Sequence, residues 1–440
     1  MNMKNNFYFL FFLCMYLGSC ASDKEYRLEE TLILAGENRT ELEKVLLHYQ
    51  DDSLKLEAAR FLLIHMKDRH SYRGAGIDSV RQALIETSRQ QGFMERGRRD
   101  KWRSYSYAGS PKVYDAQVIK ADYLIENIDL AFEAWQQRGW DKYCPFDDFC
   151  NYLLPYWVGD EIPDCWRRIY RERFQPVLDS LYQGTDIVVA VDSLQSYLQR
   201  NMNFCYNNDF SFPHAGGIFI LEHCIGTCRE ETDFLVYLLR ALGIPVAVDR
   251  YIYSPDTFLA HSWNVFRDTT GHFIPTELQR TGVTREWVNY RSKGKVYRAF
   301  SVPQEQSSIF GTLLKDVTTD YYPANEIRIA GIQGSAGEGL IGVFSMNGWI
   351  PIGGYRWHDG ETLAENIEIE QIYQPLVQTV AGWKESGYPF IPQADGTVLS
   401  LVPDTTQWES IRLVRKHPLT QYWVRQMREM DGVCFFGNNT

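Results

Sequence analysis

The stretch that most constrains the fold is GTCREETDFLVYLLRALGIPV, residues 226–246, because it carries the signals for both ends of a helix. Acidic residues follow Cys228 from Glu230 onward, and a broad stripe of phenylalanine and leucine then recurs at helical spacing. Gly243 suits the left-handed position that ends a helix, and Pro245 prevents its continuation. The sequence therefore predicts a helix from about Cys228 to Leu242, with the cysteine at its N-terminal end.

Cys228 stands where the first backbone N–H groups of a helix lack partners and the helix dipole is positive, which favours a thiolate. Glu230, Glu231 and Asp233 crowd the same end of the helix. Their charges complement the dipole, but they oppose a negative sulfur. The helix start alone therefore does not activate the thiol, and a nucleophilic Cys228 needs a base from elsewhere. A buried, inert core thiol is the alternative interpretation.

The segment that follows the helix offers such a base. GIPVAVDRYIYS is typical of a strand, and AHSWNVFRDTTGHFIPTEL predicts a β-hairpin with His261 on its first strand. A turn at 268–270 would place His261 opposite Glu277 on the second strand, where the carboxylate can orient the imidazole. Cys228, His261 and Glu277 would then supply a nucleophile, a base and an orienting acid.

These residues resemble the core of the transglutaminase-like superfamily. Its members share a Gly-x-Cys helix start, an LLRALGIP-like helix end, a His-x-Trp strand and an acid after a second strand, and residues 226–277 carry all four. The resemblance implies a papain-like core, in which the cysteine-bearing helix packs on an antiparallel sheet, with Cys228, His261 and Glu277 as catalytic residues. The family usually has aspartate in the third position, and Glu277 is one methylene longer. The flanking blocks also resemble large transglutaminase-like lipoproteins of Bacteroidetes-type bacteria.

The resemblance implies acyl chemistry on an amide. A thiolate attacks the carbonyl, ammonia or an amine leaves, and a thioester remains for water or a second amine. The implied substrates are peptides, proteins or glycopeptides, and no cofactor is implied. The backbone N–H of Cys228 is the expected first oxyanion donor, with Asn207, Asn208 and His214 as candidates for the second.

Two other classes of protein stay open. His223, Cys224, Cys228 and His261 are zinc-ligating residue types, but Cys-x₃-Cys is a loose spacing and no second cysteine pair accompanies it. The chain could also be a catalytically silent scaffold that binds peptide or glycan at the cell surface. Fast and selective labelling of the thiol distinguishes a nucleophile from a metal-bound or buried cysteine.

The chain divides into regions of different pattern, which together predict an α+β protein. Residues 20–140 carry apolar residues at helical spacing and predict a helical N-terminal region. Residues 141–315 hold the cysteine motif and form the predicted transglutaminase-like domain. Residues 316–440 contain short alternating runs separated by turns, including Asn347-Gly348 and Asp395-Gly396, and predict a β-rich, sandwich-like domain.

The N-terminus predicts export from the cytoplasm. MNMKNNFYFLFFLCMYLGSC has an early lysine and an apolar run over 7–17, shorter than the roughly 20 residues that span a bilayer. LGSC resembles the lipobox of bacterial lipoproteins, which implies a signal peptide over 1–19 and acylation of Cys20. A net charge of −11 without a dense basic cluster argues against a nucleic-acid partner. We expect a cell-envelope protein held to a membrane by lipid. Ala21 rather than aspartate follows Cys20, which by the sorting habit of Gram-negative lipoproteins implies the outer membrane, on either its periplasmic or its surface face.

The lipidation of Cys20 is directly testable. Cells fed a clickable fatty acid should incorporate the label into the wild-type protein, and Cys20→Ala should lose it because the acceptor thiol is gone. A labelled Cys20→Ala protein would rule the lipid anchor out.

Overall fold

The computed structural model describes most of the chain between residues 23 and 406. The described residues are 23–89, 107–206, 212–256, 260–278, 282–286, 291–304, 308–329, 339–345, 348–358, 361–380, 382–404 and 406. The signal segment with Cys20, the pair Asn207 and Asn208, and the chain from 407 onward lie outside them. Among the described residues, no helix is both long and apolar enough to cross a membrane.

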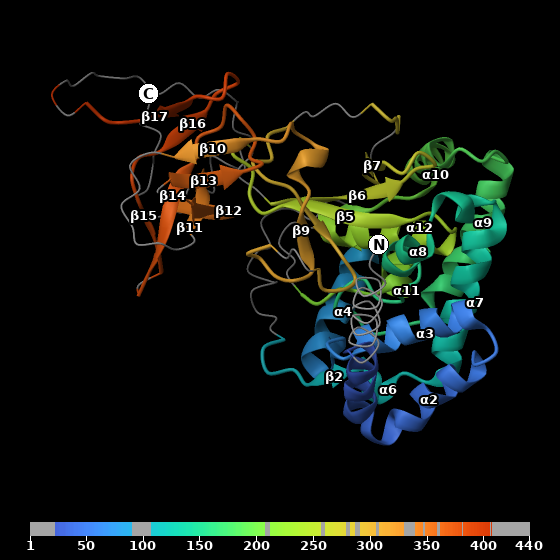
Figure 1. The fold of residues 1–440 in the computed structure, drawn as a ribbon. Coiled ribbons are helices and arrows are strands. Elements are labelled where there is room, and N and C mark those ends of the chain that lie inside the picture. Colours follow the sequence, from blue (N-terminus) through green and yellow to red (C-terminus); the bar gives the residue numbers. More distant parts are fainter. Residues whose placement is uncertain are drawn as a thin grey trace, which may run out of the picture.

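Helices form the N-terminal part of the chain, in agreement with its apolar spacing, and most of them share one core (Figure 1). They are a helix over 23–35, α2 (Arg39–His48), α3 (Ser53–Met66), α4 (Ala75–Arg89), α6 (Asp115–Val118), α7 (Ala121–Gln137) and α8 (Phe146–Tyr152). Two short antiparallel strands accompany them, β1 (His70–Tyr72) and β2 (Lys112–Tyr114).

The central part of the chain packs helices on a five-stranded antiparallel sheet. The helices are α9 (Trp166–Leu181), α10 (Ile187–Asn201), α11 (Gly217–His223) and α12 (Cys228–Ala241). The strands lie in the order β7 (Phe273–Thr276), β6 (His261–Arg267), β5 (Val246–Tyr251), β8 (Tyr297–Ala299) and β9 (Leu314–Asp316). A parallel pair, β3 (Cys205–Tyr206) and β4 (Ile225–Gly226), leads into α12. Because α12 contacts α9 as well as β5 and β6, it lies between helices and sheet.

The cysteine-bearing helix α12 begins at Cys228 and ends at Ala241, within one residue of the sequence prediction. Gly243 follows it with φ +79°, and a Cβ at this position would lie only 2.1 Å from the carbonyl oxygen of Ala134 in α7. Only glycine fits, because both the left-handed conformation and the neighbouring helix exclude a side chain. The helix differs from the prediction in burial, since it is buried around almost its whole circumference rather than along one stripe.

The far end of α12 is held by a buried arginine. Arg240 of α12 and Arg167 of α9 each donate hydrogen bonds to three backbone carbonyls of the irregular segment 152–157. Carbonyl oxygens thus compensate two guanidinium groups that are only 5% and 3% exposed. Burial lowers the pKa of Arg240 to about 10 and that of Arg167 to about 9. The pair ties α12 and α9 to the same stretch of chain.

The turn of the β6–β7 hairpin differs from the predicted one. Arg267 pairs with Phe273 rather than with Gly271, because the loop spans 268–272 instead of 268–270. The carboxylate of Asp268 folds this loop by accepting backbone hydrogen bonds within it, at 2.8 and 3.2 Å. Asx-type bonding of this kind favours a longer turn than the one assumed from the sequence.

The change of register preserves the face on which the predicted site residues lie. The predicted pairing of His261 with Glu277 is wrong by two residues, and a shift of two keeps every side chain on its own side of the sheet. Extending the observed ladder one pair beyond Thr276 places Glu277 opposite Trp263. Glu277 therefore lies diagonally across from His261 on the same face.

The C-terminal part of the chain is a separate antiparallel sheet at one end of the molecule (Figure 1). Its six strands, in spatial order, are β10 (Glu326–Ile329), β13 (Glu361–Glu365), β12 (Gly348–His358), β11 (Gly339–Ser345), β14 (Gln374–Thr379) and β15 (Gly382–Glu385). A hairpin of β16 (Phe390–Pro392) and β17 (Val398–Ser400), joined at Asp395-Gly396 as predicted, packs on this sheet's core. The central sheet extends through β9 to Asp316, one residue past the boundary expected after 315.

Candidate active site

The start of α12 is fixed by a capping box around Cys228. The Thr227 side chain accepts a hydrogen bond from Arg229 N–H, and the Glu230 carboxylate accepts one from Thr227 N–H at 2.8 Å. Gly226 permits this geometry, because a Cβ there would lie 2.3 Å from Glu230 Cβ. The GTC motif therefore sets the backbone at the helix start. Cys228 is half-buried there, at the first residue of the helix.

Two of the three acidic residues at this helix end, Glu230 and Asp233, are buried and paired, contrary to the expectation that they oppose a thiolate. Glu230 forms an ion pair with Arg229, and Asp233 lies 2.7 Å from Nδ1 of His214. Although burial lowers the pKa of His214, the adjacent Asp233 carboxylate raises it to about 9. Because Glu230 and Asp233 each have a cation beside them, these two carboxylates present less negative charge to the sulfur of Cys228 than unpaired acids would.

The structure brings the three predicted site residues together. The imidazole of His261, at the start of β6, makes a side-chain hydrogen bond with Cys228. Its Nε2 lies 3.6 Å from Oε1 of Glu277, which is long for a hydrogen bond and close enough for a strong electrostatic contact. With Nε2 directed at Glu277, Nδ1 is the ring nitrogen left for the thiol. His261 and Glu277 are 19% and 25% exposed, so solvent reaches both only in part.

The charge state of His261 follows from these two neighbours. Burial lowers the pKa of the imidazole, but its interactions with Cys228 and Glu277 together raise it to about 9. At neutral pH the ring is therefore protonated when it faces a thiolate. An imidazolium between a thiolate and a carboxylate is the resting arrangement expected for a cysteine nucleophile.

A buried network packs beside His261, and it was not predicted from the sequence. The indole of Trp263 stacks against the imidazole at 6.0 Å between centroids and donates a 2.8 Å hydrogen bond to the Tyr321 hydroxyl. Tyr321 in turn donates to Asp249 at 2.7 Å, and Arg298 binds the same carboxylate in bidentate fashion at 2.8 and 2.9 Å. These residues come from segments that are distant in the sequence. The only sequence signal for the network is the alternation of side chains along each strand, which indicates which residues of a strand share a face of the sheet.

The C-terminal region contacts the surroundings of the site at Lys293. Glu368, in the loop after β13, accepts backbone hydrogen bonds from Lys293 at 2.7 Å and Gly294 at 2.8 Å. The Lys293 side chain is buried, and its ammonium lies 5.7 Å from the centre of the Trp263 ring. Burial lowers the pKa of Lys293 to about 8, against the opposing charges of Glu368 and Glu277. The C-terminal region therefore helps to form the surroundings of Trp263 and Glu277.

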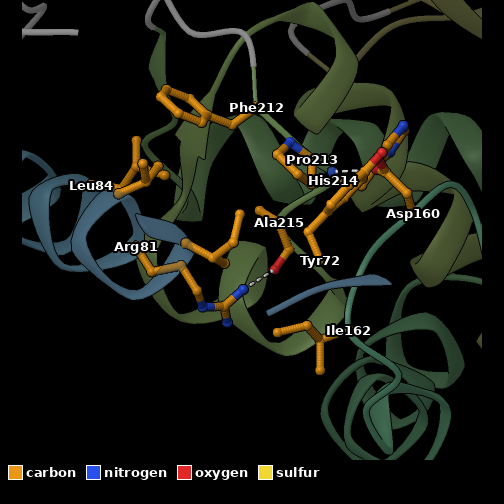
Figure 2. A pocket seen from close by; sticks show the side chains of 11 residues that line it. Tyr72, Arg81, Leu84, Asp160, Ile162, Phe212, Pro213, His214 and Ala215 are labelled. Atoms are coloured by element: carbon orange, nitrogen blue, oxygen red, sulfur yellow. Dashed lines mark hydrogen bonds between the residues drawn. The ribbon is translucent and has the colours of Figure 1, made fainter. Parts of the chain in front are cut away.

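The second oxyanion donor is not identified by the described residues. Asn207 and Asn208 lie outside them, and His214 is engaged with Asp233. His214 instead lines a small cavity that neither Cys228 nor His261 lines. Figure 2 shows this cavity, whose lining includes Tyr72, Arg81, Asp160, Phe212, Pro213 and Ala215.

The zinc site considered from the sequence is not assembled. Within the described ranges, no three side chains of His, Cys, Asp or Glu gather closely enough to hold a metal ion. His223 packs on Phe219 with ring centroids 4.7 Å apart, and the Cys224 thiol is directed at the Leu221 carbonyl at 3.7 Å. Both residues therefore close α11 rather than share a ligand set with Cys228.

Comparisons with known proteins give no match that assigns a function to the site. No protein-family model matches the sequence, and no curated protein matches it. Among solved structures, the chain is similar to a "putative cysteine protease" from Cytophaga hutchinsonii, with 16% identity and a TM-score of 0.21. That match covers 25% of this chain and 38% of the other, well under two thirds of either. A similarity of this size identifies neither the fold nor the activity.

The arrangement predicts how Cys228 responds to iodoacetamide. At pH 6.5 the wild-type thiol should alkylate about 100-fold faster than that of His261→Ala, because an ordinary thiol with a pKa near 8.5 is only about 1% ionised there. Glu277→Gln should lose less, since an amide can still orient the ring but cannot stabilise its charge. As pH rises through about 9, His261 loses its proton and the wild-type and His261→Ala rates should converge.

The measurement is peptide-resolved mass spectrometry of alkylated Cys228 between pH 5 and 10, with Cys228→Ala reporting the background from the other thiols. Equal rates at pH 6.5 in the wild type and His261→Ala would show that His261 does not activate the sulfur.

Proposed function

We propose that this protein is a thiol hydrolase or acyltransferase of the transglutaminase-like type, acting on an amide through a thioester. The observation that carries the proposal is the position of His261, hydrogen-bonded to Cys228 and 3.6 Å from Glu277. The cysteine at a helix start, the histidine at a strand start and the acid after the next strand also follow the order of the papain-like core. A silent scaffold would not require the ionised pair that this geometry favours.

The reaction follows from the roles of these residues. The Cys228 thiolate attacks the amide carbonyl, and the backbone N–H at the start of α12 stabilises the oxyanion that forms. The protonated His261 gives its proton to the leaving amine, so a neutral amine or ammonia departs and a thioester remains. His261, now neutral, then takes a proton from water or from a second amine, which attacks the thioester and releases Cys228. Glu277 stabilises the imidazolium at both stages.

The proposed setting is the cell envelope. A lipid anchor at Cys20 would hold the enzyme at a membrane surface, in the outer membrane by the sorting argument from Ala21. The substrates we propose are the amides available there, in peptides, proteins or glycopeptides. The sequence motif that supports this location lies outside the described residues.

A library of peptides and glycopeptides, incubated with the wild type and with Cys228→Ala, tests the proposal. We expect the wild type to turn over at least one class of amide and Cys228→Ala to fall by about 10³-fold or more, since it lacks the nucleophile. Intact-mass spectrometry after acid quenching should show an acyl adduct that hydroxylamine removes. Turnover that survives in Cys228→Ala, or an adduct on another cysteine, would contradict the proposal.

A further inference from the structure

Arg250 lies beside the candidate active site, and no step of the proposed reaction uses it. It belongs to β5, where it pairs with Ser262 of β6, next to the pair formed by Tyr251 and His261. Strand residues alternate between faces, and Val248, two positions earlier, packs against the core around α12. The side chain of Arg250 therefore projects from the face of the sheet that α12 covers.

The packing of α12 places Cys228 over Arg250. The backbone carbonyl of Thr232 accepts a 3.0 Å hydrogen bond from Asn264, which pairs with Val248 across the two strands. Cys228 lies one turn before Thr232, about 6 Å back along the helix. Arg250 lies two residues after Val248, about 7 Å further along the strand. α12 and β5 are joined by a short connection and run in opposite directions. Moving back along α12 to Cys228 and forward along β5 to Arg250 is therefore movement in the same direction, which brings Cys228 and Arg250 close to each other.

Half-buried Arg250 differs from three fully buried arginines in having no partner among the described residues. Arg167 and Arg240 bind carbonyls, and Arg298 binds Asp249. In the part of the chain that the structure describes, Arg250 forms no ion pair, and its buried Nε has no hydrogen-bond partner. Burial lowers the pKa of Arg250, and of its charged neighbours only the Cys228 thiolate opposes this effect. A guanidinium nevertheless keeps its charge at neutral pH.

We propose that Arg250 is a subsite for a carboxylate of the acyl-donor substrate, close to the carbonyl that Cys228 attacks. This inference rests on the proposed function and names its substrate class: peptides with a terminal or side-chain carboxylate near the scissile amide. A half-buried guanidinium gains most from an anion that brings two parallel hydrogen-bond acceptors, as a carboxylate does. The bound carboxylate would also hold the amide in register with the thiol.

Two alkylating reagents of nearly the same shape test this without knowledge of the substrate. In both reactions the Cys228 sulfur forms a bond to the methylene carbon and iodide leaves, but iodoacetate carries a carboxylate where iodoacetamide carries a neutral amide. The quantity to measure is the ratio of the two rates at Cys228. His261 contributes equally to this ratio in variants that retain it, so a change reports on Arg250.

Arg250→Gln should lower the iodoacetate-to-iodoacetamide ratio about tenfold, the effect of losing one hydrogen bond to a charged group. Arg328→Gln removes the same charge from the exposed end of the C-terminal sheet and should change the ratio less than about twofold. The same ratio in the wild type and Arg250→Gln overturns the inference, including the case in which both rates fall together because Arg250 only stabilises the thiolate. Slow alkylation by both reagents in the wild type would instead refute the proposed function.

A second measurement needs no variant at position 250. N-acetylalanine, a carboxylate, should protect wild-type Cys228 from iodoacetamide, whereas N-acetylalanine amide at the same concentration should not. Equal protection by the two compounds, or protection by neither, would overturn the inference even if Arg250→Gln failed to fold.

Discussion

The burial of α12 on all sides is the constraint on which the rest of the structure depends. A helix in this position cannot leave a polar side chain unpaired without a cost of about 1–3 kcal/mol for each lost hydrogen bond. Three of its polar residues have partners: Glu230 pairs with Arg229, Asp233 with His214, and Arg240 with the carbonyls of 152–157. These contacts fix the rotation and the depth of the helix. Cys228 lies where the buried helix begins, beside the end of strand β5 and the start of strand β6.

The geometry of the site follows from this placement and from the sheet below it. His261 opens β6, so it stands beside the start of α12, and alternation along the strand puts Trp263 next to it on the same face. Hydrogen bonds from Trp263 to Tyr321 and from Tyr321 to Asp249 prevent the indole from moving away. Because the imidazole stacks on a fixed ring, its two nitrogens keep their directions toward Cys228 and Glu277.

The sequence allowed the ends of α12 and the face of the hairpin to be predicted, because local residues determine both. Gly243 ends the helix through its own conformation, and alternation along β6 and β7 put His261 and Glu277 on one side. The register was not predictable, because the loop at 268–272 depends on the Asp268 carboxylate, which is also held by Arg285 at 2.7 Å. Arg285 lies outside the hairpin, so the sequence of the hairpin does not predict its contact with Asp268.

Burial of charged residues was the other feature that local sequence could not show. Glu230 and Asp233 look like solvent-exposed acids at a helix start. Glu230 pairs with its sequence neighbour Arg229, but only the fold brings His214 to Asp233. Arg250 has the converse property, since no described residue forms such a contact with it. The position of Lys293 likewise depends on Glu368, which lies in the loop after β13 of the C-terminal sheet.

The central claim is that a Cys228 thiolate and a His261 imidazolium stabilise each other. It is tested most directly by following the Cε1–H resonance of His261, in ¹³C-histidine-labelled protein, as a function of pH. The account predicts a midpoint near 9 in the wild type and a clearly lower one in Cys228→Ala, because removing the sulfur removes the hydrogen bond and charge that raise the pKa of His261. The same midpoint in both proteins, or a wild-type midpoint near the ordinary 6.5 of histidine, would contradict it.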